Sequence, residues 1–82
     1  MQTSEIRATV HDIWAAVLGS PDIDDELGFF DCGGDSILLI ALHTKLSEAY
    51  PQVTIKLVDL LRSSTVVEQT EALKVKLEAS AG

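Results

Sequence analysis

Ser36 follows two glycines and an aspartate, within the run FFDCGGDSI that spans residues 29–37. A serine attacks as a nucleophile only when a base lies within hydrogen-bond reach of its hydroxyl. His43 is seven residues further on, about 10 Å along a helix axis, and nothing in the sequence aims His11 at Ser36. The Gly-x-Ser-x-Gly elbow of hydrolases is absent, because Leu38 stands where the second glycine is required. Ser36 is therefore predicted to be a substrate of another enzyme, and no catalytic residue is predicted.

This run resembles the phosphopantetheine attachment motif of carrier proteins, and its GGDS core is most similar to the peptidyl carrier (thiolation) domains of nonribosomal peptide synthetases. The resemblance extends to residues 13–19, similar to the end of that family's first helix. It also includes residues 57–68, similar to the short third helix and the start of the fourth. Nearly the whole chain is covered, so residues 1–82 are expected to form a single carrier domain.

The resemblance implies that a phosphopantetheinyl transferase moves 4′-phosphopantetheine from coenzyme A to the Ser36 hydroxyl, with Mg²⁺ held by the transferase. The thiol of that group would carry aminoacyl or peptidyl thioesters between partner enzymes in nonribosomal peptide biosynthesis. The implied partners are the transferase, an adenylation domain, and condensation, tailoring or thioesterase domains.

The residues before Ser36 suit a modified serine. Asp35 is a good N-cap, because its carboxylate can accept a backbone N–H of the following helix. A phosphodiester at a helix N-terminus is favoured by the helix dipole and by unpaired N–H groups. Gly33 and Gly34 allow a sharp turn and the close approach of an enzyme. Gly34 and Asp35 are therefore predicted to take part in partner recognition.

The segment after Ser36 holds more apolar side chains than one helix face can bury. The spacing of three leucines predicts a core stripe of Leu39, Leu42 and Leu46. Ile37 and Ile40 are then candidates for an apolar docking patch, with Thr44 one turn further on. Burial of both isoleucines in the core is an equally good alternative.

The apolar spacing along the chain predicts an all-α fold, a small four-helix bundle with a long loop between the first and second helices and a short third helix. The predicted helices are residues 4–18, 35 or 36 to 50, about 57–62, and 65 onward, with 79–82 frayed. Residues 53–57 alternate like a strand, but a lone strand would leave its backbone groups unpaired, so an extended loop is predicted.

The loop of residues 20–35 is longer than most loops in compact domains, and such loops are usually functional. Leu27, Phe29 and Phe30 are predicted to hold it on the core, and Trp14 is predicted to be a core anchor. At the start of the last predicted helix, Thr65 and Glu68 form a capping-box pattern.

The composition predicts a small intracellular protein. The chain has 82 residues, of which 46% are hydrophobic, and its single cysteine cannot form an internal disulfide. Residues 1–10 lack the apolar core of a secretory signal. The longest apolar runs are far shorter than the roughly 20 residues that a membrane-spanning helix needs. We expect a cytoplasmic monomer that does not enter a membrane.

The charge is uneven. Residues 1–35 hold eight acidic residues and one basic residue, whereas residues 36–82 hold five of each. This distribution argues against nucleic-acid binding, which needs Lys and Arg to neutralise phosphates, and favours basic protein partners.

Three alternatives remain. The first is an acyl carrier protein of polyketide or fatty-acid type; the apolar Leu38 and Ala41, where fatty-acid carriers typically have charges, favour the peptidyl type. The second is a helical interaction module without a cofactor, for which Ser36→Ala would be silent. The third is a small hydrolase using Ser36, which a fluorophosphonate probe would label.

Two further features are predicted to be structural. Cys32 replaces the leucine common at its position in the motif, and no second ligand stands at metal-binding spacing, so a half-buried loop residue is expected. The acidic run of residues 22–26 fails the EF-hand template, because Leu27 and Gly33 stand where glycine and glutamate are required. No metal site is predicted, and the acidic run is expected to be solvated.

Overall fold

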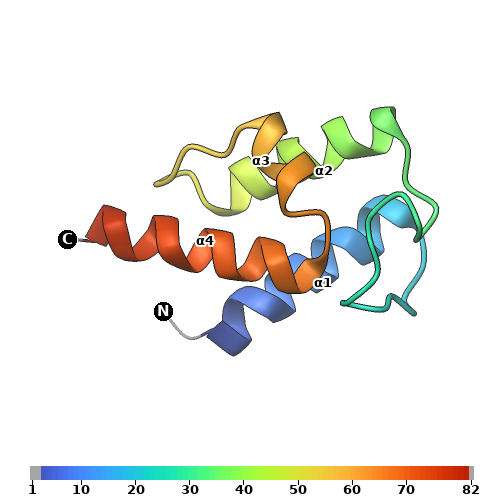
Figure 1. Cartoon of the computed structure of the whole chain (residues 1–82), viewed down its shortest axis with the longest axis horizontal. Coiled ribbons are helices and arrows are strands. Elements are labelled where there is room, and N and C mark those ends of the chain that lie inside the picture. Colours follow the sequence, from blue (N-terminus) through green and yellow to red (C-terminus); the bar gives the residue numbers. More distant parts are fainter. Residues whose placement is uncertain (1–2, 82) are drawn as a thin grey trace.

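The computed structural model describes residues 3–81 and contains only helices and loops over that range (Figure 1). The elements are α1 (Thr3–Leu18), α2 (Ser36–Ala49), α3 (Leu57–Arg62) and α4 (Val66–Ala81). The molecule measures 37 × 22 × 19 Å along its principal axes. The predicted all-α bundle, with its long first loop and short third helix, is confirmed.

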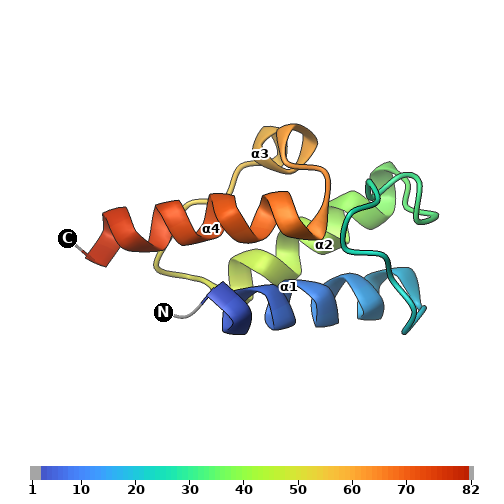
Figure 2. The same cartoon turned by 60° about the horizontal axis from the view of Figure 1, so that its bottom comes forward.

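α1 packs against both α4 and α2, and α3 packs against α2. α1 runs antiparallel to α2 and α4, so the start of α1 and the end of α4 lie at one end of the molecule (Figures 1 and 2). The loop between α1 and α2, and with it the start of α2, lies at the opposite end.

The helix boundaries match the predicted ones closely. α1 begins one residue before the predicted start, α2 begins at Ser36, and α3 spans the predicted residues. The Tyr50 N–H bonds to the carbonyl of Leu46 at 2.9 Å where α2 ends, directly before Pro51. Thr65 Oγ1 accepts the Glu68 N–H at 3.0 Å, which supplies one half of the predicted capping box.

The predicted fraying of residues 79–82 is wrong for residues 79–81, which continue α4; Gly82 lies outside the described residues. The sequence ASA contains no helix breaker, since alanine has the highest helix propensity and serine a moderate one.

Trp14 anchors the core, as predicted. Its ring is fully buried and meets the Phe29 ring edge to face, with centroids 5.1 Å apart. Its indole N–H donates to Oε1 of the buried Gln69 at 2.9 Å, which joins α1 to α4. Within residues 3–81, Gln69 Nε2 is buried without a hydrogen-bond partner. The three leucines of α2 predicted to face the core are buried: Leu39, Leu42 and Leu46.

Residues 53–56 form an extended loop that leads into α3, as predicted. Ile55 is buried, and its carbonyl accepts a hydrogen bond from His43 Nε2 on α2. The Asp59 carboxylate accepts the Lys56 N–H at 3.0 Å and lies 3.4 Å from Lys76 Nζ on α4. The bond from the Lys56 N–H is the main cause of the lowered pKa of Asp59, despite partial burial, and the Lys76 ammonium lowers it further.

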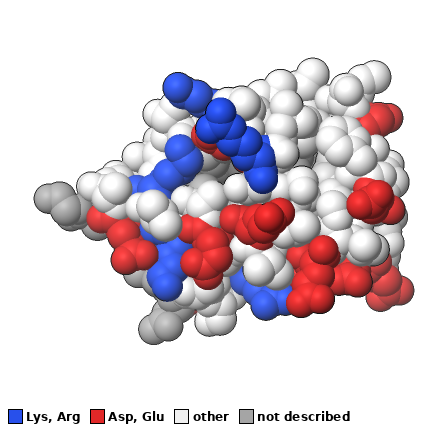
Figure 3. Space-filling model, in the orientation of Figure 1, with Lys and Arg blue, Asp and Glu red and all other residues white. Residues whose placement is uncertain are grey.

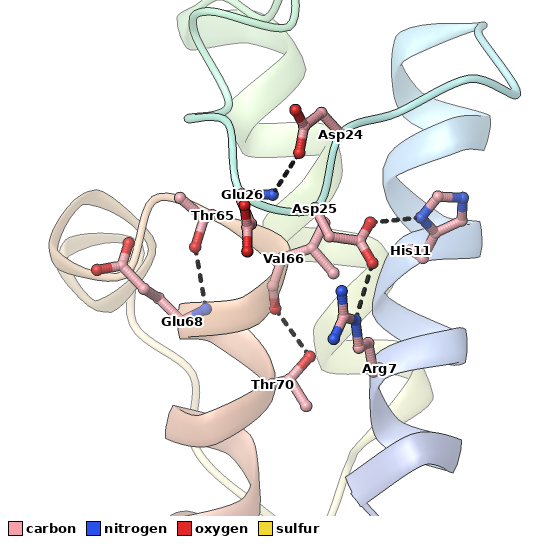
Figure 4. Close-up of polar contacts among 9 residues, drawn as sticks. All are labelled: Arg7, His11, Asp24, Asp25, Glu26, Thr65, Val66, Glu68 and Thr70. Carbon is pink, nitrogen blue, oxygen red and sulfur yellow. Dashed lines mark hydrogen bonds and ion pairs between the residues drawn. The ribbon is translucent and has the colours of Figure 1, made fainter.

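The loop between α1 and α2 is fixed by polar contacts, which Figure 4 shows, and by the burial of Phe29. Asp25 bonds to Arg7 and His11 of α1 through its side chain, and its carbonyl accepts the Val67 N–H of α4 at 3.2 Å. The expectation of a solvated acidic run is therefore wrong for Asp25, because its carboxylate accepts hydrogen bonds from Arg7 and His11 of α1.

Phe29 fixes the second half of the loop. Its ring is buried, and its N–H bonds to the carbonyl of Ser64 at 2.8 Å. The prediction that Leu27 and Phe30 also pack on the core is wrong, since their exposed fractions are 45% and 49%. Residues 29–33 form a tight turn, and the half-exposed Phe30 ring meets the Phe29 ring edge to face, with centroids 5.9 Å apart.

Gly34 lies directly against Phe29. The Phe29 carbonyl accepts the Gly34 N–H at 3.0 Å. A Cβ added at Gly34 would overlap the Phe29 ring and lie 2.8 Å from the Phe29 carbonyl oxygen. Only glycine therefore fits here, and the reason is packing against Phe29.

Replacing Trp14 by Phe leaves both polar atoms of the Gln69 amide buried without a protein partner. We expect the free energy of unfolding to fall by about 2–4 kcal/mol, because unpaired buried groups and lost ring volume both destabilise. Adding Gln69→Leu should regain about 1 kcal/mol, because an apolar side chain needs no partner. Urea denaturation measures both effects, and a further loss in the double variant would contradict this role of the hydrogen bond.

Gly34→Ala should lower the free energy of unfolding by about 1–3 kcal/mol, because the added methyl group overlaps Phe29. Gly28→Ala is the matched control in the same loop. Its Cβ would come closest to Asp31 Oδ2, at 3.1 Å, and that side chain can move away. Calorimetric melting should show the larger shift for Gly34→Ala; equal shifts would argue against the packing constraint.

Candidate functional site

Ser36 is the first residue of α2 and is exposed to solvent. Asp35 precedes it with extended backbone angles, φ −136° and ψ −176°. Asp35 Oδ1 accepts the Leu38 N–H at 2.8 Å, and the Asp35 carbonyl accepts the Leu39 N–H, also at 2.8 Å. The predicted N-cap is confirmed, and it fixes the direction in which Ser36 leaves the turn.

The start of α2 can accept a negatively charged group on Ser36. The N–H groups of Ser36 and Ile37 come before the first acceptor that the helix itself provides, so they can bond to an outside oxygen. The positive end of the helix dipole lies at the same place. The Asp35 carboxylate is already held by the Leu38 N–H. An exposed hydroxyl with free donors beside it fits a phosphate ester.

Both histidines are bonded elsewhere. His11 Nδ1 lies 2.6 Å from Asp25 Oδ1, and because an ionised carboxylate can only accept, this nitrogen donates. His43 Nε2 must likewise donate to the Ile55 carbonyl. These hydrogen bonds run to Asp25 and Ile55, and neither ring is hydrogen-bonded to Ser36, which agrees with the prediction that Ser36 is not a nucleophile of this chain's own reaction.

The predicted docking residues on α2 face outward. Ile37 is 77% exposed and Ile40 is 56% exposed, so their burial in the core is excluded. Thr44 is exposed one turn later, and its hydroxyl donates to the Ile40 carbonyl at 3.1 Å. Binding of a partner at these residues remains a prediction.

Gly34 has a role that the sequence did not reveal. It is half-buried, and the close approach that it allows is to Phe29. Gly33 is exposed and has φ +97°, a left-handed backbone angle that favours glycine, so it makes the turn. Recognition of Gly34 by a partner also remains a prediction.

The outward face of α3 was missed in the sequence. Leu57, Val58 and Leu61 are all exposed there, and only Leu60 of this helix is buried. A signal was present, because four of the six residues in LVDLLR are apolar and so short a helix cannot bury them all. These residues add an apolar surface on the helix that packs against α2.

Cys32 has the environment of a structural cysteine. It is half-buried against the core, and its N–H bonds to the Gly28 carbonyl at 3.0 Å. Burial raises the pKa of its thiol, and the charges of Asp24 and Asp31 raise it further. The thiol therefore stays protonated near neutral pH, which makes it a poor nucleophile and metal ligand.

Metal-binding and membrane-spanning features are not found among residues 3–81. No group of three or more His, Cys, Asp or Glu side chains there is arranged to hold a metal ion. In the acidic run, Asp24 Oδ1 accepts the Glu26 N–H at 2.9 Å and so makes a turn. None of the helices in this range has the length and apolar character needed to cross a bilayer.

Comparison with known proteins identifies the same motif. Residues 8–73 match the family described as "Phosphopantetheine attachment site". The chain is 35% identical over 80 residues to the hybrid PKS-NRPS synthetase TAS1 of Cordyceps militaris, covering 89% of this chain and 5% of that protein. It is 32% identical over 82 residues to a linear gramicidin synthase of Brevibacillus parabrevis, covering 92% of this chain and 1% of that protein.

The fold also matches a solved structure. BlmI, a type-II acyl-carrier-protein from Streptomyces verticillus involved in bleomycin biosynthesis, superposes with a TM-score of 0.85 at 24% identity. The match covers 92% of this chain and 89% of BlmI. The chain is thus similar to a whole small protein in structure and to a few per cent of the length of the large synthetases in sequence. It belongs to the phosphopantetheine-attachment family of carrier domains, which are not catalysts and which bear a 4′-phosphopantetheine prosthetic group.

Proposed function

We propose that Ser36 is the attachment point and that the chain carries aminoacyl or peptidyl groups in nonribosomal peptide biosynthesis. The observation that carries the proposal is the exposed Ser36 hydroxyl at the capped start of α2, within the segment that matches the attachment-site family. The proposal includes a cytoplasmic monomer; the single cysteine, which cannot form an internal disulfide, supports the reducing compartment.

Attachment would join Ser36 Oγ to the phosphorus of coenzyme A that bears pantetheine. The pyrophosphate P–O bond breaks, and adenosine 3′,5′-bisphosphate leaves. The hydroxyl proton goes to a base of the transferase, because neither His11 nor His43 is hydrogen-bonded to Ser36. When bound, the group supplies a thiol on a flexible arm, and tethering raises the effective concentration of its cargo at each partner.

The surface of α2 supports the peptidyl type. Its first three turns contain no acidic residue, and Ile37 and Ile40 stand exposed beside Ser36. Resemblance to fatty-acid carriers would lead one to expect charges on this face. The gramicidin synthase relative is consistent with the peptidyl type. The alternative, an acyl carrier of polyketide type, is supported by the hybrid synthetase relative.

Incubation with coenzyme A, Mg²⁺ and a broad-specificity phosphopantetheinyl transferase should add one phosphopantetheinyl group, measured by intact mass. Ser36→Ala should abolish the gain, because the accepting hydroxyl is removed. Ser4→Ala is the matched control, an exposed serine in the first turn of α1, and should be modified like the wild type. Absence of a gain on the folded wild type would refute the assignment.

The modified domain then distinguishes the two carrier types. Adenylating enzymes with ATP and an amino acid should load the thiol, with a mass gain equal to the aminoacyl group. Loading by acyl-transferring enzymes alone would support the polyketide alternative.

Ile40→Asp should reduce kcat/KM for modification by about tenfold or more, because an apolar contact with the partner is replaced by a charge. Its effect on stability should be within about 0.5 kcal/mol, since the site is exposed. Val75→Asp is the control, because Val75 is 64% exposed on α4. Equal activity of the two variants would contradict docking at α2.

A further inference from the structure

Asp25 connects the loop between α1 and α2 to two helices at once (Figure 4). Its Oδ2 accepts a hydrogen bond from Arg7 Nε at 2.9 Å, and its Oδ1 lies 2.6 Å from His11 Nδ1. Its carbonyl accepts the Val67 N–H in the first turn of α4. We call these contacts of Asp25 with Arg7, His11 and Val67 the clasp.

The clasp is partly sheltered and charged. The Asp25 side chain is only 17% exposed. Although burial alone would raise the pKa of Asp25, the hydrogen bonds and positive charges of His11 and Arg7 outweigh it, and the pKa is lowered. Asp25 is therefore ionised near neutral pH. Charge-assisted hydrogen bonds of this kind are stronger than those between neutral groups.

The clasp also determines what the loop presents to solvent. Arg7 is the only Lys or Arg among residues 1–35, and its guanidinium bonds to Asp25. Residues 24–31 also hold three exposed acidic side chains and two exposed apolar side chains. We call these residues the loop surface: Leu27, Phe30, Asp24, Glu26 and Asp31.

The loop surface lies at the Ser36 end of the molecule. Figure 3 shows acidic side chains gathered at the end where Figure 1 places the loop and the start of α2. On the face shown, Lys and Arg lie in the middle and towards the other end, where further acidic side chains lie among them. A protein with basic side chains around an apolar contact would match this surface.

We propose that Asp25 is a positioning residue for the modification of Ser36, and that the clasp holds the loop surface ready for a basic face of the phosphopantetheinyl transferase. This inference rests on the proposed function. A loop that is ordered in advance does not lose conformational entropy when the partner binds. Without the clasp, the loop would have to be ordered during binding, which weakens association.

The chemical step should not depend on the clasp. Ser36 is positioned by Phe29, Gly34 and the Asp35 N-cap, and none of these contacts involves Asp25. Loss of the clasp should therefore raise KM and leave kcat unchanged, the pattern of an interaction that is equal in the bound and transition states.

The test compares steady-state modification of the wild type, Asp25→Asn and a stability control at saturating coenzyme A. Asp25→Asn keeps the size of the side chain and removes its charge. Its KM should rise by about 3- to 10-fold at unchanged kcat, the effect of ordering a few side chains on binding. Leu77→Val is the control, a buried residue near the far end of α4, and should leave KM unchanged.

Amide hydrogen exchange gives a readout that does not require modification. Exchange at Val67 and in residues 24–28 should accelerate in Asp25→Asn and not in Leu77→Val. An unchanged KM in Asp25→Asn, or a KM raised equally in Leu77→Val, would overturn the positioning role while leaving the proposed function intact. Failure of the wild type to gain a phosphopantetheinyl group would instead overturn the proposed function.

Discussion

The site depends on the burial of a single loop side chain, Phe29. Its ring fills the space between Trp14 and Gly34, and its carbonyl accepts the Gly34 N–H. These contacts fix the turn that Asp35 caps, and the cap fixes the first residue of α2. A long loop, usually the most variable part of a small domain, here ends in a defined geometry because one aromatic ring joins it to the core.

The polar groups around this framework are used for structure. His11 and His43 hold loops to helices, and Asp25 holds the first loop to two helices. Ser36 is left exposed at a helix start, and neither histidine is hydrogen-bonded to it. That division suits a domain that other enzymes act upon. Under the proposed function, the exposed apolar side chains of α2 and α3 would be part of the surface that partners contact.

Most of the fold could be predicted from the sequence, because helix periodicity, Pro51 and the Asp35 cap are local signals. The buried leucines of α2 followed from their spacing. The exposure of Leu27 and Phe30 could not be predicted from spacing, because a turn has no period to show which of several apolar side chains points inward. The clasp could not be predicted either, since nothing in the run of residues 22–26 shows which carboxylate meets Arg7. Such contacts depend on tertiary geometry.

The start of α1 and the end of α4 lie together at the end of the molecule opposite Ser36. In a synthetase whose chain continues beyond both helices, the domain would be attached at one pole only. A rotation about that pole would sweep the serine through an arc whose radius is set by the 37 Å long axis. The rigid length of the domain would then add to the reach of the phosphopantetheine arm without any change in the bundle.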